Sequence, residues 1–457
     1  MTMSADAAAR VHDLFDRLLG APLPLRLRAW DGSEAGPPGR PTVVIGDRRA
    51  LRRLLWQPNE LGLARAYVAG ELDVDGDLYE ALAQLFGVIR APRTGRGGPT
   101  WRSRAAMLRG LAALGGLGAE PQPPPEEVAL HGRKHSLSRD RQAVSHHYDV
   151  GNDFYRIVLG PSMVYSCAYW TADRPGYDLA DAQRDKLDLI CRKLAVRPGM
   201  RLLDVGCGWG SLALHAASRY GAQVVGVTLS AQQATYARKQ VAEAGLTDRI
   251  DIRVQDYREV DDGPYDVIAS VGMAEHVGLD QYRRYAGKLY GLLRPGGRLL
   301  NHQIAQLRPD PAPSGRTPTF IEAYVFPDGE LKPVGTTVSL LEEAGFEVRH
   351  VEALREHYGR TLRCWVANLE SRWDEAVRLS GLGRARVWRL YMTACALAFE
   401  AGHIGVNQVL AIRTHPDGSA AADHPAVPDA AGGAASGADP GDPGRYRDPR
   451  GGVTAGP

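Results

Sequence analysis

A strand, a glycine turn and a helix are predicted in immediate succession by the run MRLLDVGCGWGSLALHAA, residues 200–217. The apolar residues before Asp204 are typical of a buried strand, and a helical pattern resumes after Gly210. Gly206 and Gly208 lie in the turn between them. Because glycine has no Cβ and tolerates positive φ, such a turn lets backbone N–H groups approach a ligand closely. The run therefore predicts a nucleotide-like ligand at the end of a strand.

The surrounding chain, from about residue 143 to residue 413, predicts one α/β domain. The apolar runs AQVVGVTLS and PYDVIASVG alternate with helical stretches, and the runs RLLNHQI and FEVRHVEAL predict later strands. This alternation is typical of a doubly wound, mostly parallel, Rossmann-like sheet. In such a sheet the ligand lies at the carboxyl ends of the strands.

Three further segments are predicted outside residues 143–413. Residues 1–90 indicate a small α+β domain that contains an amphipathic helix and a short strand. Residues 91–142 are basic and rich in glycine and proline, which is typical of a linker. The arginines of this linker fit either a solvated hinge or docking to an anionic membrane surface. Residues 414–457 have almost no large apolar side chain and are expected to be disordered.

The composition argues against several classes of function. A formal net charge of +2 over 457 residues argues against a dedicated nucleic-acid-binding protein. The 5 cysteines include no CxxC pair, which argues against a disulfide framework or a structural zinc site, so no metal is expected and a reducing cytoplasm fits. The N-terminal residues lack the layout of a signal peptide. The sequence contains no run of about 18 apolar residues, the length needed to span a membrane.

The glycine turn alone does not distinguish a dinucleotide from another adenosyl ligand. A dehydrogenase would show GxGxxG and an acidic residue about 20 residues later. Here the spacing is GxGxG, Asp204 precedes it, and the next strand ends in Thr228, Leu229 and Ser230 without an acid. Asp256 follows the third strand. Because two flanking aspartates fit an adenosyl group with an amino-acid tail, we expect S-adenosyl-L-methionine as the cofactor.

Further stretches resemble the cyclopropane-fatty-acyl-phospholipid synthase family, a lipid-modifying branch of the class I S-adenosylmethionine-dependent methyltransferases. They follow the family's order over most of residues 143–405, and AYVAGELDVDGDL is similar to the N-terminal domain of the longer members. The matching stretches are HHYDVGNDFY (146–155), MVYSCAYW (163–170), AQRDKLDLICRKL (182–194), LLDVGCGWG (202–210), GVTLSAQQ (226–233), SVGMAEHVG (270–278), LRPGGRLLNHQI (293–304), YVFPDGELKP (324–333), HYGRTLRCW (357–365) and YMTACALAFEAG (391–402).

The resemblance implies methyl transfer from the sulfonium of S-adenosylmethionine to a cis double bond in an acyl chain of a membrane phospholipid. The alkene must be held in line with the methyl group, and water must be excluded because the attack creates a carbocation. Loss of a proton and ring closure then give a cyclopropane. The resemblance also implies a bound bicarbonate as the base, held in a small polar nest at the end of an apolar acyl tunnel.

The resemblance places this nest on the side chains of Glu275, His302 and Tyr358 and on the backbone near Cys167 and Ile304. His302 and Tyr358 can donate hydrogen bonds to bicarbonate, and Glu275 can accept one from its hydroxyl. Each residue type also fits a structural role. A carboxylate suits a helix N-terminus, and a histidine or a tyrosine can pack in a core.

Two cysteines need separate treatment. Cys395 lies in a helical pattern and is the residue that has sometimes been regarded as catalytic in the family. Methylation of an alkene needs no thiolate, so we expect Cys395 to pack and Cys167 to lie in the site without acting as a nucleophile.

The resemblance, together with the glycine turn, also implies a set of cofactor contacts. They are Tyr165, Ser166, Asp204, Gly206, Gly208, Gly210, Thr228, Leu229, Ser230, Gln233, Asp256 and Tyr257.

The sequence departs from the family pattern beside the predicted nest. Ala274 stands where the family usually has a large aromatic residue, and Glu330 and Lys332 add charge to YVFPDGELKP. Loss of an aromatic ring changes how a cation is stabilised. A second product is therefore open: a methylene branch formed after a hydride shift, which a flavin-dependent partner reductase would convert to a methyl branch.

Two other classes of function stay open from the residues. One is a methyltransferase for a small soluble metabolite or a free lipid, and the other is a non-enzymatic scaffold that binds S-adenosylmethionine or lipid. The lipid reading implies an unsaturated phospholipid acyl chain as the partner, no nucleic acid, and a cytoplasmic protein peripheral to the inner face of the membrane. A homodimer is a further expectation.

Overall fold

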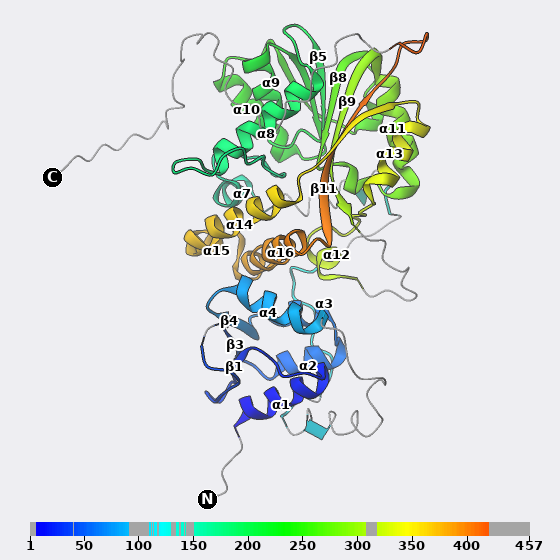
Figure 1. The fold of residues 1–457 in the computed structure, drawn as a ribbon. Helices are drawn as coiled ribbons and strands as arrows, with labels where there is room; N and C mark the ends of the chain where they lie inside the picture. The colour runs from blue at the N-terminus through cyan, green and yellow to red at the C-terminus, as the bar shows by residue number, and fades with distance from the viewer. Residues whose placement is uncertain are drawn as a thin grey trace, which may run out of the picture. The chain divides into compact units, whose positions relative to one another are not determined.

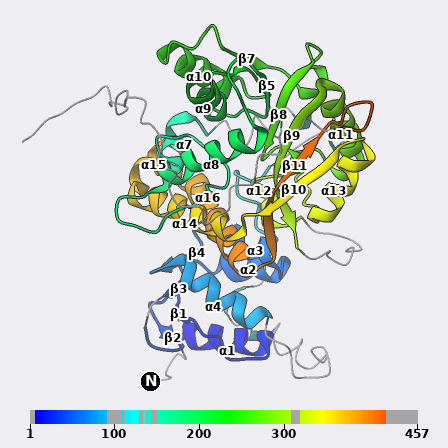
Figure 2. The same cartoon turned by 45° about the horizontal axis from the view of Figure 1, so that its top comes forward.

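The computed structural model describes residues 6–39, 41–90, 109–110, 112, 114–116, 118–128, 134–136, 139–140, 142, 150–307 and 318–419. Two sheets organise these residues (Figures 1 and 2). The smaller sheet has four strands in the order β2-β1-β3-β4, and the larger has seven in the order β10-β11-β9-β8-β5-β6-β7.

The smaller sheet belongs to the N-terminal α+β region. In it β3 pairs in parallel with β1 and antiparallel with β4, and β1 pairs antiparallel with β2. Buried leucines and alanines of its helices form one hydrophobic core with the sheet. The elements are α1 (Ala7–Leu19), β1 (Arg26–Arg28), β2 (Glu34–Ala35), β3 (Thr42–Ile45), α2 (Arg49–Trp56), α3 (Glu60–Val68), β4 (Leu72–Asp75) and α4 (Leu78–Arg90). The expected amphipathic helix and short strand are α1 and β4.

The larger sheet confirms the predicted doubly wound, mostly parallel α/β fold. Strands β9, β8, β5, β6 and β7 are parallel, and β11 runs antiparallel between β9 and β10. The strands are β5 (Arg201–Val205), β6 (Gln223–Thr228), β7 (Ile250–Val254), β8 (Tyr265–Val271), β9 (Leu293–Gln306), β10 (Glu347–Ala353) and β11 (Ile404–Ile412). Strand β11 was not predicted, because the adjacent polar residues Asn407 and Gln408 interrupt its apolar pattern although both are buried.

Helices cover both faces of the larger sheet. Helices α8 (Leu179–Leu194), α9 (Ser211–Tyr220) and α10 (Ala231–Glu243) share a core with one face. Helices α11 (Leu279–Leu292) and α13 (Val334–Glu343) share a core with the other face. Two short 3-10 helices, η1 (Tyr257–Glu259) and η2 (Ala274–His276), follow β7 and β8.

A third group of helices lies between the larger sheet and the N-terminal elements in Figures 1 and 2. It contains α7 (Asn152–Leu159), α12 (Phe320–Tyr324), α14 (Arg355–Ser371), α15 (Trp373–Ser380) and α16 (Leu382–Glu400). Its core is rich in aromatic side chains, including Tyr155, Trp209, Trp365 and Trp388.

Described residues of the predicted linker contact both regions. The carbonyl of Gln122 accepts a hydrogen bond from Arg53, Glu127 pairs with Arg65, and the N–H of Val128 donates to Ala323 in α12 at 2.8 Å. These residues are therefore held by specific contacts. The domain limits at residues 90, 142 and 413 stay predictions, and most of the predicted tail and of the linker's arginines lies outside the described residues.

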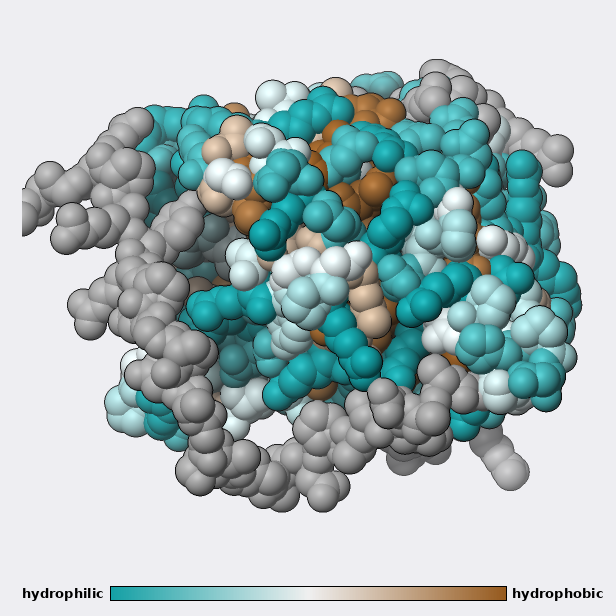
Figure 3. All heavy atoms as spheres, turned by 90° about the horizontal axis from the view of Figure 1, so that it is seen from above, coloured by the Kyte–Doolittle hydropathy of each residue, from teal (hydrophilic) through white to brown (hydrophobic). Residues whose placement is uncertain are grey.

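Within the part of the chain that the structure describes, no helix is long and apolar enough to cross a bilayer. The face shown in Figure 3 is mostly hydrophilic, with hydrophobic residues visible in recesses between polar ones.

Candidate active site

The glycine turn after β5 is shaped by contacts that only glycine permits. The N–H groups of Gly206 and Cys207 both donate to the carbonyl of Val227, at 2.9 and 3.0 Å, which ties the turn to β6. Gly206, Gly208 and Gly210 have φ values of 77°, 56° and 84°. A Cβ on Gly206 would lie 3.0 Å from the Met273 side chain, whereas a Cβ on Gly208 would meet no atom within 4 Å. The turn thus leaves open space at Gly208.

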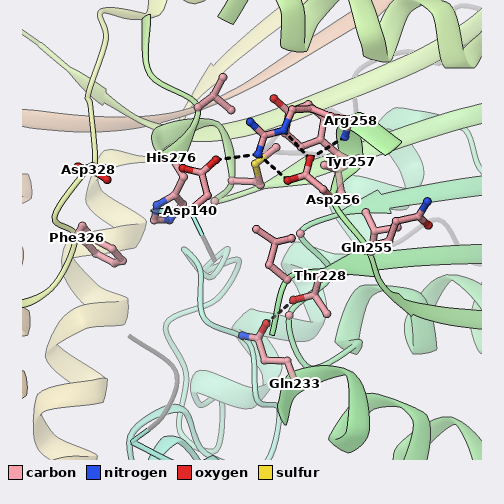
Figure 4. A pocket seen from close by; sticks show the side chains of 18 of the residues that line it. Asp140, Thr228, Gln233, Gln255, Asp256, Tyr257, Arg258, His276, Phe326 and Asp328 are labelled. Carbon is pink, nitrogen blue, oxygen red and sulfur yellow. Dashed lines mark hydrogen bonds and ion pairs between the residues drawn. The ribbon is translucent and has the colours of Figure 1, made fainter. Parts of the chain in front are cut away.

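A pocket opens where β5, β6, β7 and β8 end (Figure 4). The Thr228 hydroxyl donates to Gln233 Oε1 at 2.8 Å across one wall. On another wall, the two carboxylate oxygens of Asp256 accept from the backbone and guanidinium of Arg258 at 2.6 to 2.9 Å. The predicted cofactor residues that line the pocket are Gly206, Gly208, Thr228, Leu229, Gln233, Asp256 and Tyr257.

Five other predicted cofactor residues lie near this pocket without lining it. Gly210 and Ser230 are the N-caps of α9 and α10. The Tyr165 hydroxyl donates to that of Tyr391 at 3.2 Å, and Ser166 Oγ accepts from Lys186 Nζ at 2.9 Å. Asp204 is buried beneath the turn. Their predicted contacts with the cofactor stay predictions.

Asp204 and Lys186 form a buried pair of titratable groups under the turn. Burial raises the pKa of Asp204 to about 7, and the charge of Lys186 opposes this rise. Burial likewise lowers the pKa of Lys186 to about 8. Lys186 lies in a stretch that resembles the family, but no residue pattern marked it as a partner of Asp204.

Glu275 and Ile304, two residues of the predicted nest, are in direct contact. Glu275 lies in η2, just past the end of β8, and its Oε1 accepts from the backbone N–H of Ile304 in β9 at 2.7 Å. Its Oε2 is buried without a hydrogen-bond partner among the described residues. Burial raises the pKa of Glu275 to about 7, and the nearby charge of Lys332 acts in the opposite direction.

His302 lies two residues before Ile304 on β9, so both side chains are on the same face of the sheet. It is 2% exposed, and its Nε2 meets no hydrogen-bonding group in the described part of the chain. Burial, with the charges of Lys186 and Lys193, lowers the pKa of His302 to about 3, so the imidazole is neutral. Glu275 and His302 thus each hold one buried polar atom that no group of the described residues satisfies.

Tyr358 of α14 belongs to the same neighbourhood. It packs against Phe399 with ring centroids 4.6 Å apart. Its pKa is raised well above the ordinary value, first by burial and then by neighbours that include Tyr165, Cys167 and Glu275. The structure therefore gathers Tyr358 with Glu275 and Cys167, although the roles of these residues stay predictions.

Comparisons with known proteins identify the family of the chain. The family model described as mycolic acid cyclopropane synthetase matches residues 135–409. The chain belongs to this family.

Relatives extend the similarity over almost the whole chain. A probable fatty acid methyltransferase of Mycobacterium tuberculosis is 42% identical over 86% of this chain and 92% of its own length. The tuberculostearic acid methyltransferase UfaA1 of the same organism is 32% identical over 90% of this chain and 93% of its own length. The structure of the mycolic acid cyclopropane synthase CmaA1 with SAH and CTAB matches with a TM-score of 0.55 and 33% identity, over 60% of this chain and 98% of that one.

This member of the mycolic acid cyclopropane synthetase family is therefore an S-adenosylmethionine-dependent fatty acid methyltransferase. Its pocket fits the cofactor on grounds of its own. Gly208 has no side chain and leaves open space for a ligand beside its backbone. The polar groups of Thr228, Gln233 and Asp256 line the same pocket, where β5 to β8 end. The cofactor, when bound, supplies an electrophilic methyl group.

Several pocket residues of this family member were not predicted. Asp140 accepts from Arg258 at 2.8 Å, and Arg139 forms a two-fold ion pair with Asp328 at 2.6 and 3.0 Å. His276 and Phe326 complete this side of the pocket in Figure 4. Asp328, His276 and Phe326 lie inside matching stretches, but Asp140 lies in the predicted linker, where its composition gave no signal for a site.

Neither Cys167 nor Cys395 is an activated thiol. The Cys167 thiol donates to the carbonyls of Ala168 and Leu354, at 3.2 and 3.6 Å, and burial raises its pKa. Burial raises the pKa of Cys395 to about 12. Both thiols are therefore protonated near neutral pH, which argues against a thiolate nucleophile.

Proposed function

We infer that the chain transfers a methyl group from S-adenosylmethionine to a cis double bond in an unsaturated acyl chain of a membrane phospholipid, giving a cyclopropane fatty acid. The carbon–sulfur bond of the donor breaks as a bond forms to one alkene carbon. The other alkene carbon becomes a cation, and loss of a proton from the new methyl group with ring closure completes the product. The net gain is one CH₂ group for each double bond.

The observation that carries this proposal is the pair of unsatisfied buried atoms, Glu275 Oε2 and His302 Nε2, beside an aromatic core. Burial of polar atoms without partners is costly, so such atoms indicate a small polar ligand. Glu275 can accept from the hydroxyl of bicarbonate, and His302 can donate to one of its oxygens. Bicarbonate would supply the base for the proton. The aromatic walls would exclude water from the cation.

The residues that would surround the acyl chain favour an apolar substrate. Tyr155 lies 4.7 Å from Trp209 between ring centroids, and Tyr165 lies 5.4 Å from Trp365. A small soluble metabolite would need a polar pocket, and a non-enzymatic scaffold would have no need for the buried polar atoms of Glu275 and His302. The basic residues before the catalytic region would bring the protein to the anionic inner face of the membrane.

A methyl-branched product is the second candidate, and two observations favour it. The relatives that cover at least 86% of this chain include two probable fatty acid methyltransferases and a tuberculostearic acid methyltransferase. In addition, Ala274, where an aromatic residue was expected, is buried with the tyrosines of α11. Both products require a base, so the nest serves either. The branched product would need a hydride shift and a flavin-dependent reductase as partner.

Product analysis tests the proposal directly. The protein is expressed in a host that contains oleoyl phospholipids, and total fatty acid methyl esters are analysed by mass spectrometry. A gain of one CH₂ that resists ozonolysis supports the cyclopropane. The same gain with a cleavable methylene double bond supports the branched product. Unchanged acyl chains, in the presence of a folded protein that binds S-adenosylmethionine, would rule out both.

A further inference from the structure

Three strands place Glu352, Gln408 and His302 in one row across the larger sheet. Gln408 of β11 is the register partner of Glu352 in β10 and of His302 in β9. Helix α8 packs over this face, and its Lys193 reaches the row from above. Gln408 is fully buried, Lys193 is 4% exposed and His302 is 2% exposed, so water does not compete for their hydrogen bonds.

Lys193 fixes the orientation of the Gln408 amide. Lys193 Nζ donates to Gln408 Oε1 at 2.7 Å and also pairs with Glu352. An ammonium group has three donors and no acceptor, so only the oxygen of the amide can face it. The NH₂ group of Gln408 must therefore point the other way, toward His302.

The orientation of the amide in turn decides which imidazole nitrogen carries the proton. Gln408 Nε2 lies 3.2 Å from His302 Nδ1. Because the amide nitrogen can only donate, Nδ1 must accept, and a neutral imidazole then carries its proton on Nε2. That Nε2 is the buried nitrogen that lacks a partner among the described residues.

We propose that Gln408 is a positioning residue, held by Lys193, that locks neutral His302 in the Nε2–H tautomer so that this N–H is a hydrogen-bond donor toward the reaction site. This role rests on the proposed function, in which His302 holds an oxygen of the polar ligand. With the other tautomer, Nε2 would present a lone pair and repel that oxygen. The neutral state agrees with the neighbouring charges, since both Lys186 and Lys193 disfavour an imidazolium.

The tautomer is measured without any assay of activity. Two-bond ¹⁵N–¹H correlation spectra of ¹⁵N-histidine-labelled protein distinguish the protonated from the unprotonated ring nitrogen, and the His302→Gln variant assigns the His302 signals. We expect the wild-type protein to show protonated Nε2 and unprotonated Nδ1. A wild-type protein with protonated Nδ1, or with an imidazolium near neutral pH, would overturn the proposal.

Three variants, one at Gln408 and a pair at Lys193, test the cause. In Gln408→Glu, the carboxylate can only accept hydrogen bonds. It should still bind Lys193, but it can bond to Nδ1 of His302 only when Nδ1 carries a proton. We expect His302 to lose the neutral Nε2–H form and turnover to fall by roughly 10²-fold, as for loss of one aimed donor. Lys193→Met should release the amide and mix the tautomers, whereas Lys193→Arg should keep the wild-type spectrum because arginine also only donates.

The outcomes separate this inference from the proposed function. An unchanged His302 tautomer in folded Gln408→Glu or Lys193→Met protein rejects the positioning role, whatever the activity. A tautomer that changes as expected while turnover and S-adenosylmethionine affinity stay at wild-type values supports the lock and rejects the proposed place of His302 in the site. If Gln408→Glu does not fold, judged by thermal unfolding, the wild-type spectrum and the Lys193 pair decide.

Discussion

The two carboxylate oxygens of Glu275 differ in their hydrogen bonding. One accepts a hydrogen bond, and the other has no partner among the described residues. The bond from Ile304 N–H to Oε1, at 2.7 Å, orients the carboxyl group and leaves Oε2 for a ligand. In Glu275→Gln the amide oxygen can keep the bond to Ile304, while an NH₂ group replaces the free acceptor. We expect S-adenosylmethionine affinity within about twofold of wild type and turnover reduced by roughly 10²-fold or more.

Calorimetric titration with S-adenosylmethionine and a turnover assay on unsaturated phospholipid vesicles measure the two quantities for this variant. Lys239→Gln on the exposed face of α10 provides the matched control, since among the described residues Lys239 forms an ion pair only with exposed Glu243. Full turnover by Glu275→Gln would remove Glu275 from the mechanism. Loss of cofactor binding would assign it a structural role instead.

Lys332 is a second feature at this scale, and it predicts a pH dependence. Its Nζ is buried 5.0 Å from the centre of the Tyr282 ring and has no hydrogen-bond partner within the described ranges. Burial raises the pKa of Glu275 to about 7, and the positive charge of Lys332 holds this pKa down. Turnover should therefore fall as pH drops through the pKa of Glu275, because protonation removes the acceptor.

Lys332→Met should move this acid limb of kcat to higher pH, since loss of a nearby positive charge disfavours the carboxylate. Lys332→Arg keeps the charge and should leave the limb close to wild type. The profiles are measured as kcat against pH at saturating S-adenosylmethionine. A limb that stays in place, or moves to lower pH, in Lys332→Met would contradict the coupling.

The resemblance predicted Glu275 and His302 as residues of the nest. It gave no sign that Gln408 and Lys193 would lie beside His302. Gln408 and Lys193 lie 106 and 109 residues from His302, and β11 was not predicted as a strand. Their contact with His302 depends on strand order and register in the larger sheet. A single sequence without that register carries no signal for them.

At the scale of elements, the glycine turn between β5 and α9 has two roles, one in helix packing and one in leaving room for a ligand. Gly210 is the N-cap of α9, with φ 84°, and a Cβ there would lie 2.9 Å from that of Ala237 in α10. Gly208 has φ 56° and open space around its Cβ position, which faces the pocket. The first glycine permits helix packing, and the second leaves room for a ligand.

Alanine at each position should separate these functions. Gly210→Ala combines backbone strain with a steric clash, so we expect a loss of about 2 kcal/mol in the free energy of unfolding. Gly208→Ala carries strain without a clash and should lose less stability but more S-adenosylmethionine affinity. Urea unfolding and calorimetric binding measure both variants. Equal losses of stability with equal affinities would mean that the turn does not divide its roles in this way.

Elements were predictable where their patterns were local. The strands β5 to β8 and the helices after them follow apolar periodicity, and the predicted parallel fold is correct. By contrast, Arg139 and Asp140 reach the pocket through ion pairs with Asp328 and Arg258, which lie 189 and 118 residues away in the chain. A basic stretch with glycines and prolines indicated only a linker, because composition does not reveal distant partners.

At the scale of the whole molecule, α16 joins the N-terminal region to the site. One side of this helix carries Tyr391, whose hydroxyl accepts from Tyr165. Another side carries Arg386, whose guanidinium donates to the carbonyls of Tyr67 and Leu72 at 2.9 and 3.2 Å and to Asp73 at 2.5 Å. The N-terminal region therefore supports the helix that also bounds the aromatic core.

Arg386→Ala should weaken this support. The substitution removes the charged donor that the carbonyls of Tyr67 and Leu72 share at a largely buried contact, so we expect a loss of about 2 kcal/mol in the free energy of unfolding. Arg283→Ala is the matched control, because Arg283 is exposed and, in the described part of the chain, pairs only with exposed Glu343, a type of pair that contributes about 0 to 1 kcal/mol. Urea unfolding compares the two variants, and hydrogen exchange locates the change. If α16 connects the two regions, Arg386→Ala should increase hydrogen exchange in α16 and also in the N-terminal strand β4. Equal stability of the two variants would show that this contact does not hold the regions together.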